Sequence, residues 1–186
     1  MRLFVSLDLS PDLRDAVATV QESFADAGGL SFTDPTQAHV TVKFLGDVDA
    51  DRADTVSETV ADAVEAIDVG AFDASFEGLG VFPSLDYISV VWLGVDDGSR
   101  ELTRLHEAID DALAAEGFER EDHEFTPHVT LARMQDARGK ARVVDRVENT
   151  HPVAGRMRVT ELTLTESTLT ADGAVHETKE SFPLTE

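Results

Sequence analysis

The sequence predicts a mixed α+β fold built from two similar lobes. Segments with the two-residue alternation of strands follow segments with helical spacing through most of the 186 residues. The last two strand-like segments are joined by Asp172-Gly173, a typical hairpin turn, so a purely parallel sheet is not expected. His-Val-Thr-Val at 39–42 recurs as His-Val-Thr-Leu at 128–131, and no linker separates the halves. We therefore expect a single bilobal domain at 1–186, with antiparallel or mixed sheets and flanking helices, whose lobes are related by a pseudo-twofold axis around a central cleft.

The first half of the chain is predicted as strand, helix, strand and helix. Pro11 follows Ser10, and this pair is typical of a helix N-terminus with the serine as N-cap. Gly28-Gly29 ends the helical pattern, and a polar loop precedes the first His-Val-Thr-Val strand. The predicted elements are a strand at 2–7, a helix from 11 to about 27, a strand ending at 45–46 and a helix at 50–67.

The second half is predicted to repeat this alternation and to close with a β-hairpin. A nearly continuous apolar run at 87–93 is suited to a central strand, whereas Gly-Val-Phe-Pro-Ser at 80–84 is expected to break the strand before it. The predicted elements are strands at 72–79 and 87–93, a helix at 99–115, the second motif strand at 127–132, a helix at 137–147, and strands at 157–165 and 175–182.

The net charge is strongly negative, at −22, from 37 acidic and 15 basic residues. Such a surface repels nucleic acid on average, and its acidity is typical of proteins adapted to high salt, so we expect a halophilic protein whose stability rises with salt. Basic residues nevertheless gather directly after the second motif, which indicates either a phosphate-bearing substrate or a solvated basic surface. They are Arg133, Arg138, Lys140, Arg142, Arg146, Arg156 and Arg158.

The composition also excludes several classes of site. Without cysteine, the chain has no disulfide, no thiolate metal site and no cysteine nucleophile. It starts directly with a strand-like segment, and no apolar run approaches membrane-spanning length. We expect a cytoplasmic protein that does not associate with membranes.

The repeated tetrapeptides carry the chemistry. In a strand, residues two apart share a face, so His39 with Thr41 and His128 with Thr130 present two imidazoles and two hydroxyls. A neutral histidine can accept a proton, a protonated one can donate it, and hydroxyls can donate to an anion, which suits metal-free transfer at a phosphate. A single strand histidine is most often structural, but two copies in matching contexts favour function. Neither motif contains the His-Glu-x-x-His pattern or a cysteine pair, which disfavours zinc.

Two cations and three aromatic residues near the motifs are weaker candidates for substrate contacts. Lys43 falls on the face of His39 and Thr41, although a solvent-facing lysine at a strand end is an equal alternative. Arg133 falls on the face opposite His128 and reaches a phosphate only if the strand ends or bulges near Ala132. The aromatic side chains could stack a nucleobase, but their apolar surroundings favour core packing. They are Phe44, Phe82 and Trp92.

The motifs and their flanks resemble the 2H phosphoesterase superfamily, and within it the RNA 2′,3′-cyclic phosphodiesterase branch, also called 2′-5′ RNA ligase-like. The segments 39–46, His-Val-Thr-Val-Lys-Phe-Leu-Gly, and 126–133, Thr-Pro-His-Val-Thr-Leu-Ala-Arg, are similar to that branch's two motifs nearly residue for residue. Segments 2–7 and 80–95 resemble it too, so the likeness spans most of the chain. The chain departs from it at 84–86, where Ser-Leu-Asp replaces residues that are often basic in the family.

This resemblance implies a metal-independent and cofactor-independent hydrolase that opens terminal 2′,3′-cyclic phosphates of RNA to 2′-phosphomonoesters, with the reverse direction giving 2′-5′ RNA ligation. It assigns His39 as proton donor to the leaving oxygen and His128 as the proton acceptor that activates water. Thr41 and Thr130 would hydrogen-bond the nonbridging phosphate oxygens, and Arg133 is expected to bind substrate. The expected partners are RNA ends, tRNA fragments among them, and we expect a monomer.

Two alternatives stay open at this point. The same four residues would serve a phosphodiesterase for small cyclic nucleotides or for ADP-ribose cyclic phosphate. A different class is a nucleotide- or RNA-binding module without turnover, against which the intact histidines and threonines of both motifs argue.

Overall fold

The computed structural model of the chain describes residues 1–185 and combines strands, α-helices and three short 3-10 turns. The strands are β1 (Arg2–Asp8), β2 (Leu30–Phe32), β3 (His39–Asp47), β4 (Phe72–Pro83), β5 (Ile88–Val95), β6 (His128–Met134), β7 (Val153–Val159), β8 (Glu161–Thr170) and β9 (Gly173–Pro183). The α-helices are α1 (Pro11–Glu22), α2 (Ala53–Ala66), α3 (Ser99–Ala115) and α4 (Lys140–Asn149).

The strands form one curved antiparallel sheet in which the two motif strands are central neighbours. The order is β7-β4-β5-β6-β3-β1-β8-β9, and β2 pairs with β6 outside this path. Four strands on either side of the β3–β6 contact therefore make two matching halves, β9-β8-β1-β3 and β6-β5-β4-β7. The predicted α+β fold with two similar halves is confirmed, and the motif strands, one from each half, lie side by side in a single sheet.

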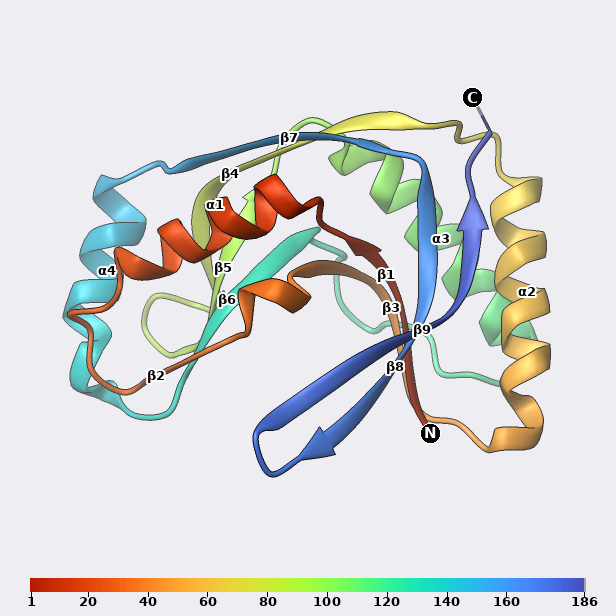
Figure 1. Cartoon of the computed structure of the whole chain (residues 1–186), viewed down its shortest axis with the longest axis horizontal. Coiled ribbons are helices and arrows are strands. Elements are labelled where there is room, and N and C mark those ends of the chain that lie inside the picture. The colour runs from red at the N-terminus through yellow and green to blue at the C-terminus, as the bar shows by residue number, and fades with distance from the viewer. Residues whose placement is uncertain (186) are drawn as a thin grey trace.

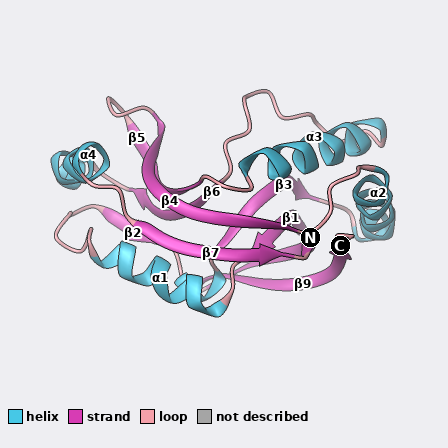
Figure 2. Ribbon diagram, turned by 90° about the horizontal axis from the view of Figure 1, so that it is seen from above, coloured by secondary structure: helices cyan, strands magenta, loops and turns pink. Residues whose placement is uncertain are grey.

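The helices cover the two halves in pairs. Helices α1 and α4 lie over the half that contains β4, β6 and β7, whereas α2 and α3 pack on each other beside β3 and β9 (Figure 1). Seen from above, α1 and α3 lie on opposite sides of the sheet (Figure 2). Among residues 1–185, no helix is both long and apolar enough to cross a membrane.

Buried side chains of the motif strands hold the alternate residues on the other face. Val40 and Val129 are 0% and 1% exposed, and Val42 and Leu131 are equally buried among the core residues. Each such side chain contributes about 1.5–3 kcal/mol when fully buried. Because a shift of one residue would move this apolar set to the open face, the burial fixes which side His39 occupies.

Three sequence-based boundaries were wrong. The helix expected to reach about 27 ends at Glu22, because the amides of residues 23–25 donate to the carbonyl three residues back and tighten the chain into turns. The segment 80–84 does not end the strand at 79, because β4 continues to Pro83 and Gly80 pairs with Trp92 of β5. The indole ring of Trp92 lies against Gly80, where an added Cβ would collide with it, so the glycine makes room for a side chain. The expected strand at 157–165 is two strands, because the chain leaves β4's side at Thr160 and joins β1 as β8.

Candidate active site

The register of β3 and β6 brings the two motifs together. Val40 pairs directly with Val129 in the antiparallel ladder. His39 therefore lies opposite Thr130, and Thr41 lies opposite His128, with all four on the face away from the buried valines. Side chains opposite each other in such a pair have Cβ atoms about 4.5–5.5 Å apart. The fold thus gathers the four predicted catalytic residues into one compact set.

Each histidine is anchored through the same ring nitrogen. Nδ1 of His39 lies 2.9 Å from the carbonyl oxygen of Gln37, and Nδ1 of His128 lies 2.7 Å from that of Thr126. A carbonyl oxygen only accepts hydrogen bonds, so Nδ1 carries the proton in both rings. Nε2 is then the nitrogen that exchanges protons with a ligand, and in His39 it lies 3.1 Å from Oγ1 of Thr41.

The electrostatic surroundings of the two histidines differ. Burial lowers the pKa of His39 below its ordinary value, while the Gln37 carbonyl and the carboxylate of Asp8 oppose this effect. Burial also lowers the pKa of His128, and the Thr126 carbonyl opposes it, but here His39 and Arg133 lower the pKa further. Two neighbouring cationic or titratable groups therefore disfavour the protonated form of His128, whereas a carboxylate favours the protonated form of His39.

Aromatic rings hold both imidazoles in place. The ring of His39 lies 5.0 Å from that of Phe4 and 5.3 Å from that of His176, which β9 contributes. The ring of His128 meets Phe82 edge-on at 4.9 Å and lies 5.8 Å from Trp92. Such packing restricts ring rotation, as proton transfer in a fixed direction requires.

The neighbours that the sequence reasoning missed come from outside the motifs. Asp8 continues the alternation of β1 on the open face, which is a signal that sequence alone could have used once β1 and β3 were paired. His176 lies in a polar strand with no motif around it, and only the fold brings it to His39. The anchoring carbonyls of Gln37 and Thr126 leave no sequence signal, because every residue carries a carbonyl.

A β-bulge brings Arg133 to the side of His128. Trp92 pairs with Thr130, but Val91 pairs with Ala132, so Leu131 is an extra residue in β6. The alternation therefore shifts by one position, and the exposed Arg133 returns to the open face. From the sequence, Arg133 was expected to reach a phosphate only if the strand ends or bulges near Ala132, and β6 has such a bulge.

The matching bulge in β3 has the opposite effect on Lys43. Ser6 pairs with Thr41 but Val5 pairs with Lys43, which leaves Val42 as the extra residue. Lys43 is 3% exposed, and its Nζ lies 2.6 Å from Oδ1 of Asp110 and 2.7 Å from the carbonyl oxygen of Glu119. Its ammonium is thus engaged within the protein, and this geometry favours a structural role over the predicted contact with substrate.

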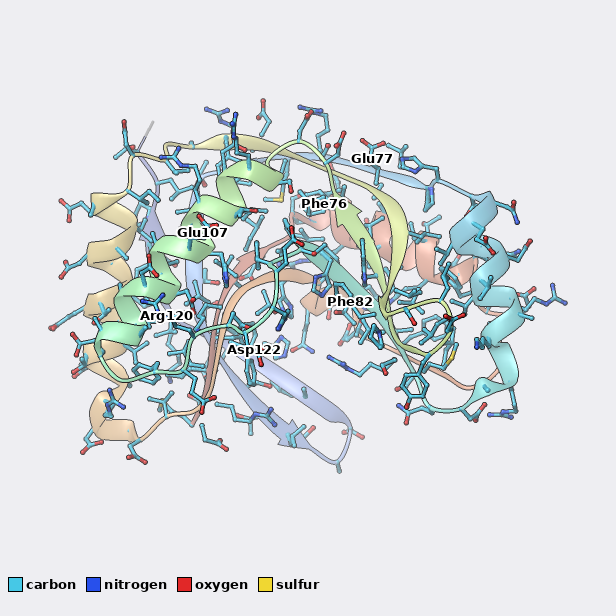
Figure 3. The ribbon with its side chains drawn as sticks, turned by 180° about the vertical axis from the view of Figure 1, so that it is seen from behind. Phe76, Glu77, Phe82, Glu107, Arg120 and Asp122 are labelled. Carbon is cyan, nitrogen blue, oxygen red and sulfur yellow. The ribbon has the colours of Figure 1, made fainter. Side chains whose placement is uncertain are left out.

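A largely apolar cavity of about 460 Å³ adjoins the motifs. Thr41 and His128 line it, together with Phe44 and Phe82, so it opens directly beside the candidate catalytic groups. Glu121 and residues 123–126 of the segment that follows α3 also line it, and Figure 3 shows Phe82 and Asp122, the latter in this segment, on separate parts of the chain. The cavity is suited to a flat apolar group attached to a phosphate held by the histidines.

The basic residues after the second motif do not form a free positive patch. Five of the arginines pair with carboxylates from other segments or neighbouring turns, and Lys140 donates to a backbone carbonyl. The pairs are Arg138–Asp136, Arg142–Asp26, Arg146–Asp26, Arg156–Asp97 and Arg158–Asp73. Within residues 1–185, Arg133 is the member of this group whose side chain has neither an ion pair nor a hydrogen bond, so it is the cation that the fold leaves available at the motifs.

No group of three or more histidine, aspartate or glutamate residues within residues 1–185 is arranged to hold a metal ion. Metal-independent catalysis stays a prediction that an assay with a chelator has to test.

Comparison with known proteins agrees with this geometry. The family model described as the 2′-5′ RNA ligase superfamily matches residues 4–170. The chain belongs to the 2′-5′ RNA ligase superfamily. A relative from Methanothermobacter thermautotrophicus, named RNA 2′,3′-cyclic phosphodiesterase, is 32% identical over 99% of both chains. One of the same name from Archaeoglobus fulgidus is 32% identical over 95% of this chain and 96% of its own.

Solved structures share the fold of this chain. A crystal structure of a Thermus thermophilus protein superimposes with a TM-score of 0.82 at 25% identity, covering 99% of this chain and 98% of that one. Escherichia coli LigT, crystallised with 3′-AMP, gives a TM-score of 0.82 at 24% identity, covering 100% of this chain and 98% of LigT. The fold of these two proteins therefore extends over nearly the whole chain.

Proposed function

We propose that this member of the 2′-5′ RNA ligase superfamily is an RNA 2′,3′-cyclic 3′-phosphodiesterase, a hydrolase that opens the terminal cyclic phosphate to a 2′-phosphomonoester. One observation carries the proposal: two imidazoles whose Nδ1 atoms are anchored, so that Nε2 is the proton-exchanging nitrogen, lie on one face, diagonal to each other and beside two threonine hydroxyls. The names of the archaeal relatives support the same activity.

The reaction uses one histidine as base and the other as acid. Neutral His128 takes a proton from water through Nε2 as the water oxygen attacks phosphorus. The bond between phosphorus and the 3′-oxygen breaks, and protonated His39 gives its Nε2 proton to that oxygen. The products are a 2′-phosphomonoester and a free 3′-hydroxyl. General acid and base catalysis contribute about 10²–10⁴-fold each.

The charge that develops on the phosphate requires donors that are already in place. Thr41 and Thr130 supply hydroxyls on the same face as the histidines, and we propose that they donate to the nonbridging oxygens. The guanidinium of Arg133 is proposed to add a charge-assisted bond. Its effect on the pKa of His128 also supports the neutral, proton-accepting state of that ring.

The adjoining cavity supports a nucleotide as the group that carries the cyclic phosphate. Phe44 is 47% exposed at the cavity, and Phe82 lines it beside His128, so both present ring surface on which a base could stack. Lys43 contributes to the same wall through its ion pair with Asp110. If a 5′-hydroxyl of a second RNA takes the place of water, the same acid and base would form a 2′-5′ phosphodiester.

A phosphodiesterase for small cyclic nucleotides or ADP-ribose cyclic phosphate is a second candidate. The observation in its favour is that carboxylates neutralise most of the basic residues at 133–158, which removes the expected track for a longer polyanion. Equal kcat/KM on a cyclic mononucleotide and on an oligonucleotide would support the small substrate. Action on tRNA fragments, a monomeric state and a cytoplasmic location stay predictions.

The test is hydrolysis of a short RNA with a 2′,3′-cyclic phosphate end in molar KCl with a chelator. We expect a 2′-phosphate product from the parent and a loss of activity in His39→Ala and in His128→Ala. His151→Ala is a matched control, because this exposed histidine lies outside the motifs. A parent without turnover, whose affinity for the RNA survives both substitutions, would instead support a binding module.

A further inference from the structure

We propose that Asp8 is a positioning residue that gives His39 the acid role by stabilising its protonated form. This inference rests on the proposed function, because it explains how two equivalent motifs divide the acid and base roles. Asp8 is the last residue of β1 and lies directly opposite His39 in the β1–β3 ladder. Its carboxylate is therefore a near neighbour of the imidazole on the open face of the sheet.

The corresponding position beside the second motif is a glycine. Val40 pairs with Leu7 of β1, and the corresponding Val129 pairs with Leu93 of β5. The residue opposite His39 in one half therefore corresponds to the residue opposite His128 in the other. That second partner is Gly94. A Cβ at Gly94 would lie 2.9 Å from the carbonyl oxygen of Glu77, so this position has no room for a carboxylate. The two halves thus differ at this pair of positions by one acidic side chain.

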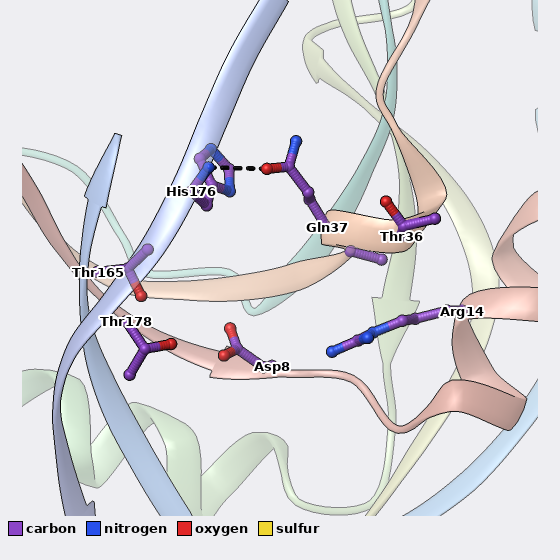
Figure 4. Close-up of a pocket in the computed structure, with 8 residues that line it drawn as sticks. Asp8, Arg14, Thr36, Gln37, Thr165, His176 and Thr178 are labelled. Carbon is purple, nitrogen blue, oxygen red and sulfur yellow. Dashed lines mark hydrogen bonds between the residues drawn. The ribbon is translucent and has the colours of Figure 1, made fainter. Parts of the chain in front are cut away.

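Neighbouring hydroxyls hold the Asp8 carboxylate in place. Ser6 Oγ donates to its Oδ1 at 3.1 Å, and Thr163 Oγ1 donates to its Oδ2 at 3.4 Å. Asp8 also lines a polar pocket of about 160 Å³ together with Arg14 and His176 (Figure 4). Asp8 is only partly buried, so it keeps contact with solvent at its place opposite His39 in the ladder.

The other titratable or charged side chains placed around His39 are two histidines and an arginine, and none of them is an anion. His176 from β9 contacts the ring, His128 lies diagonally across on β6, and Arg14 from α1 shares the polar pocket with Asp8. Burial and then the neighbouring His39 lower the pKa of His176, so its surroundings favour the neutral ring. Asp8 is therefore the group among these that favours an imidazolium at His39.

The decisive experiment is an NMR titration of the histidine rings in unliganded Asp8→Asn and parent proteins in molar KCl. Asparagine removes the charge and keeps one oxygen that can accept from Ser6 or from Thr163, while its amide group takes the place of the other oxygen. We expect the pKa of His39 to fall by about one unit, as for the loss of a nearby opposite charge, and that of His128 to move less. Asp15→Asn, on the exposed side of α1, controls for the change in net charge.

The pH profile of kcat/KM gives a second readout. The basic limb reports loss of the proton from the acid, so Asp8→Asn is expected to move that limb to lower pH and leave the acidic limb in place. Asp8→Glu, which restores the charge, should recover most of the shift. If Asp8→Asn does not fold, Asp8→Ser provides the same comparison.

An unchanged His39 titration in folded Asp8→Asn or Asp8→Ser would overturn the assignment of Asp8. A parent without hydrolytic activity would overturn the proposed function, yet the ring titration would still decide whether Asp8 favours the protonated form of His39. The two failures are therefore distinguishable.

Discussion

Replacing Asp110 with alanine tests whether Lys43 supports the fold or contacts the substrate. The ammonium of Lys43 is 3% exposed and the side chain of Asp110 is 11% exposed, so their ion pair is largely removed from water. Asp110→Ala leaves a buried ammonium with only the Glu119 carbonyl as a partner. Loss of one partner from a buried pair costs about 3–5 kcal/mol, and molar salt reduces this cost little because the pair is buried.

Urea unfolding in molar KCl, followed by circular dichroism, measures this loss. Lys43→Met leaves a buried carboxylate in place of a buried ammonium and is expected to cost a similar free energy of unfolding. The double variant Lys43→Met/Asp110→Leu removes both charges, and we expect it to recover most of the stability, since apolar pairs of similar volume often replace buried ion pairs without loss. The coupling between the two sites should therefore exceed about 1 kcal/mol.

The kinetic data separate the two roles. A structural Lys43 predicts that the double variant has a KM close to that of the parent, because the cavity wall is restored. A Lys43 that binds phosphate predicts a raised KM in both variants that lack it. The structural assignment would be refuted if Lys43→Met unfolded at the parent's urea concentration while its KM rose about tenfold, the effect of one lost charge-assisted bond.

Three further predictions concern the motifs and their support. Arg133→Gln should lower kcat/KM about 10–100-fold through loss of a charged hydrogen bond, without a change in urea midpoint; an unaltered kcat/KM would remove Arg133 from the site. The pKa values of His39 and His128 are lower in the folded protein than the ordinary value of 6.5, so the unfolded chain binds protons more readily. The free energy of unfolding should therefore be highest above pH 6.5 and should fall as the pH decreases below it. The urea midpoint of the double variant His39→Gln/His128→Gln, measured at a series of pH values, should depend less on pH than that of the parent. Gly80→Ala should displace Trp92, shifting its fluorescence and slowing turnover; parent-like fluorescence would contradict the packing argument.

The sequence predicted most elements because their signals are local. Helix α3 occupies the expected 99–115, and a hairpin joins β8 and β9 as expected, although its turn is Ala171-Asp172 and Gly173 already begins β9. The strand break at Thr160 carries no such signal, since it depends on β7 joining β4 and β8 joining β1. Pairings between distant segments decide this boundary.

The four motif residues of the candidate site were predictable from the sequence, whereas the positions of Lys43 and Arg133 were not. The alternation of His39 with Thr41, and of His128 with Thr130, holds up to the bulges and correctly places all four on one face. Beyond the bulges the simple alternation fails for Lys43 and Arg133, because the extra residue in each strand moves the following side chains to the opposite face of the sheet. Nothing in the residues themselves marks these positions, since the bulged Val42 and Leu131 look like ordinary buried strand residues.

A symmetric pair of motifs cannot by itself direct a proton from one side of a phosphate to the other. The motif histidines share the same anchoring through Nδ1, and each is followed two residues later by a threonine, so direction must come from positions where the halves differ. One such difference is the arginine of β6, Arg133, at the position that Phe44 occupies in β3. The cation lies near His128 and disfavours its protonation, whereas the aromatic ring lies at the cavity. Exchange of these two residues should therefore disturb both the assignment of acid and base and the orientation of the nucleotide. Either substitution alone should disturb only one of the two.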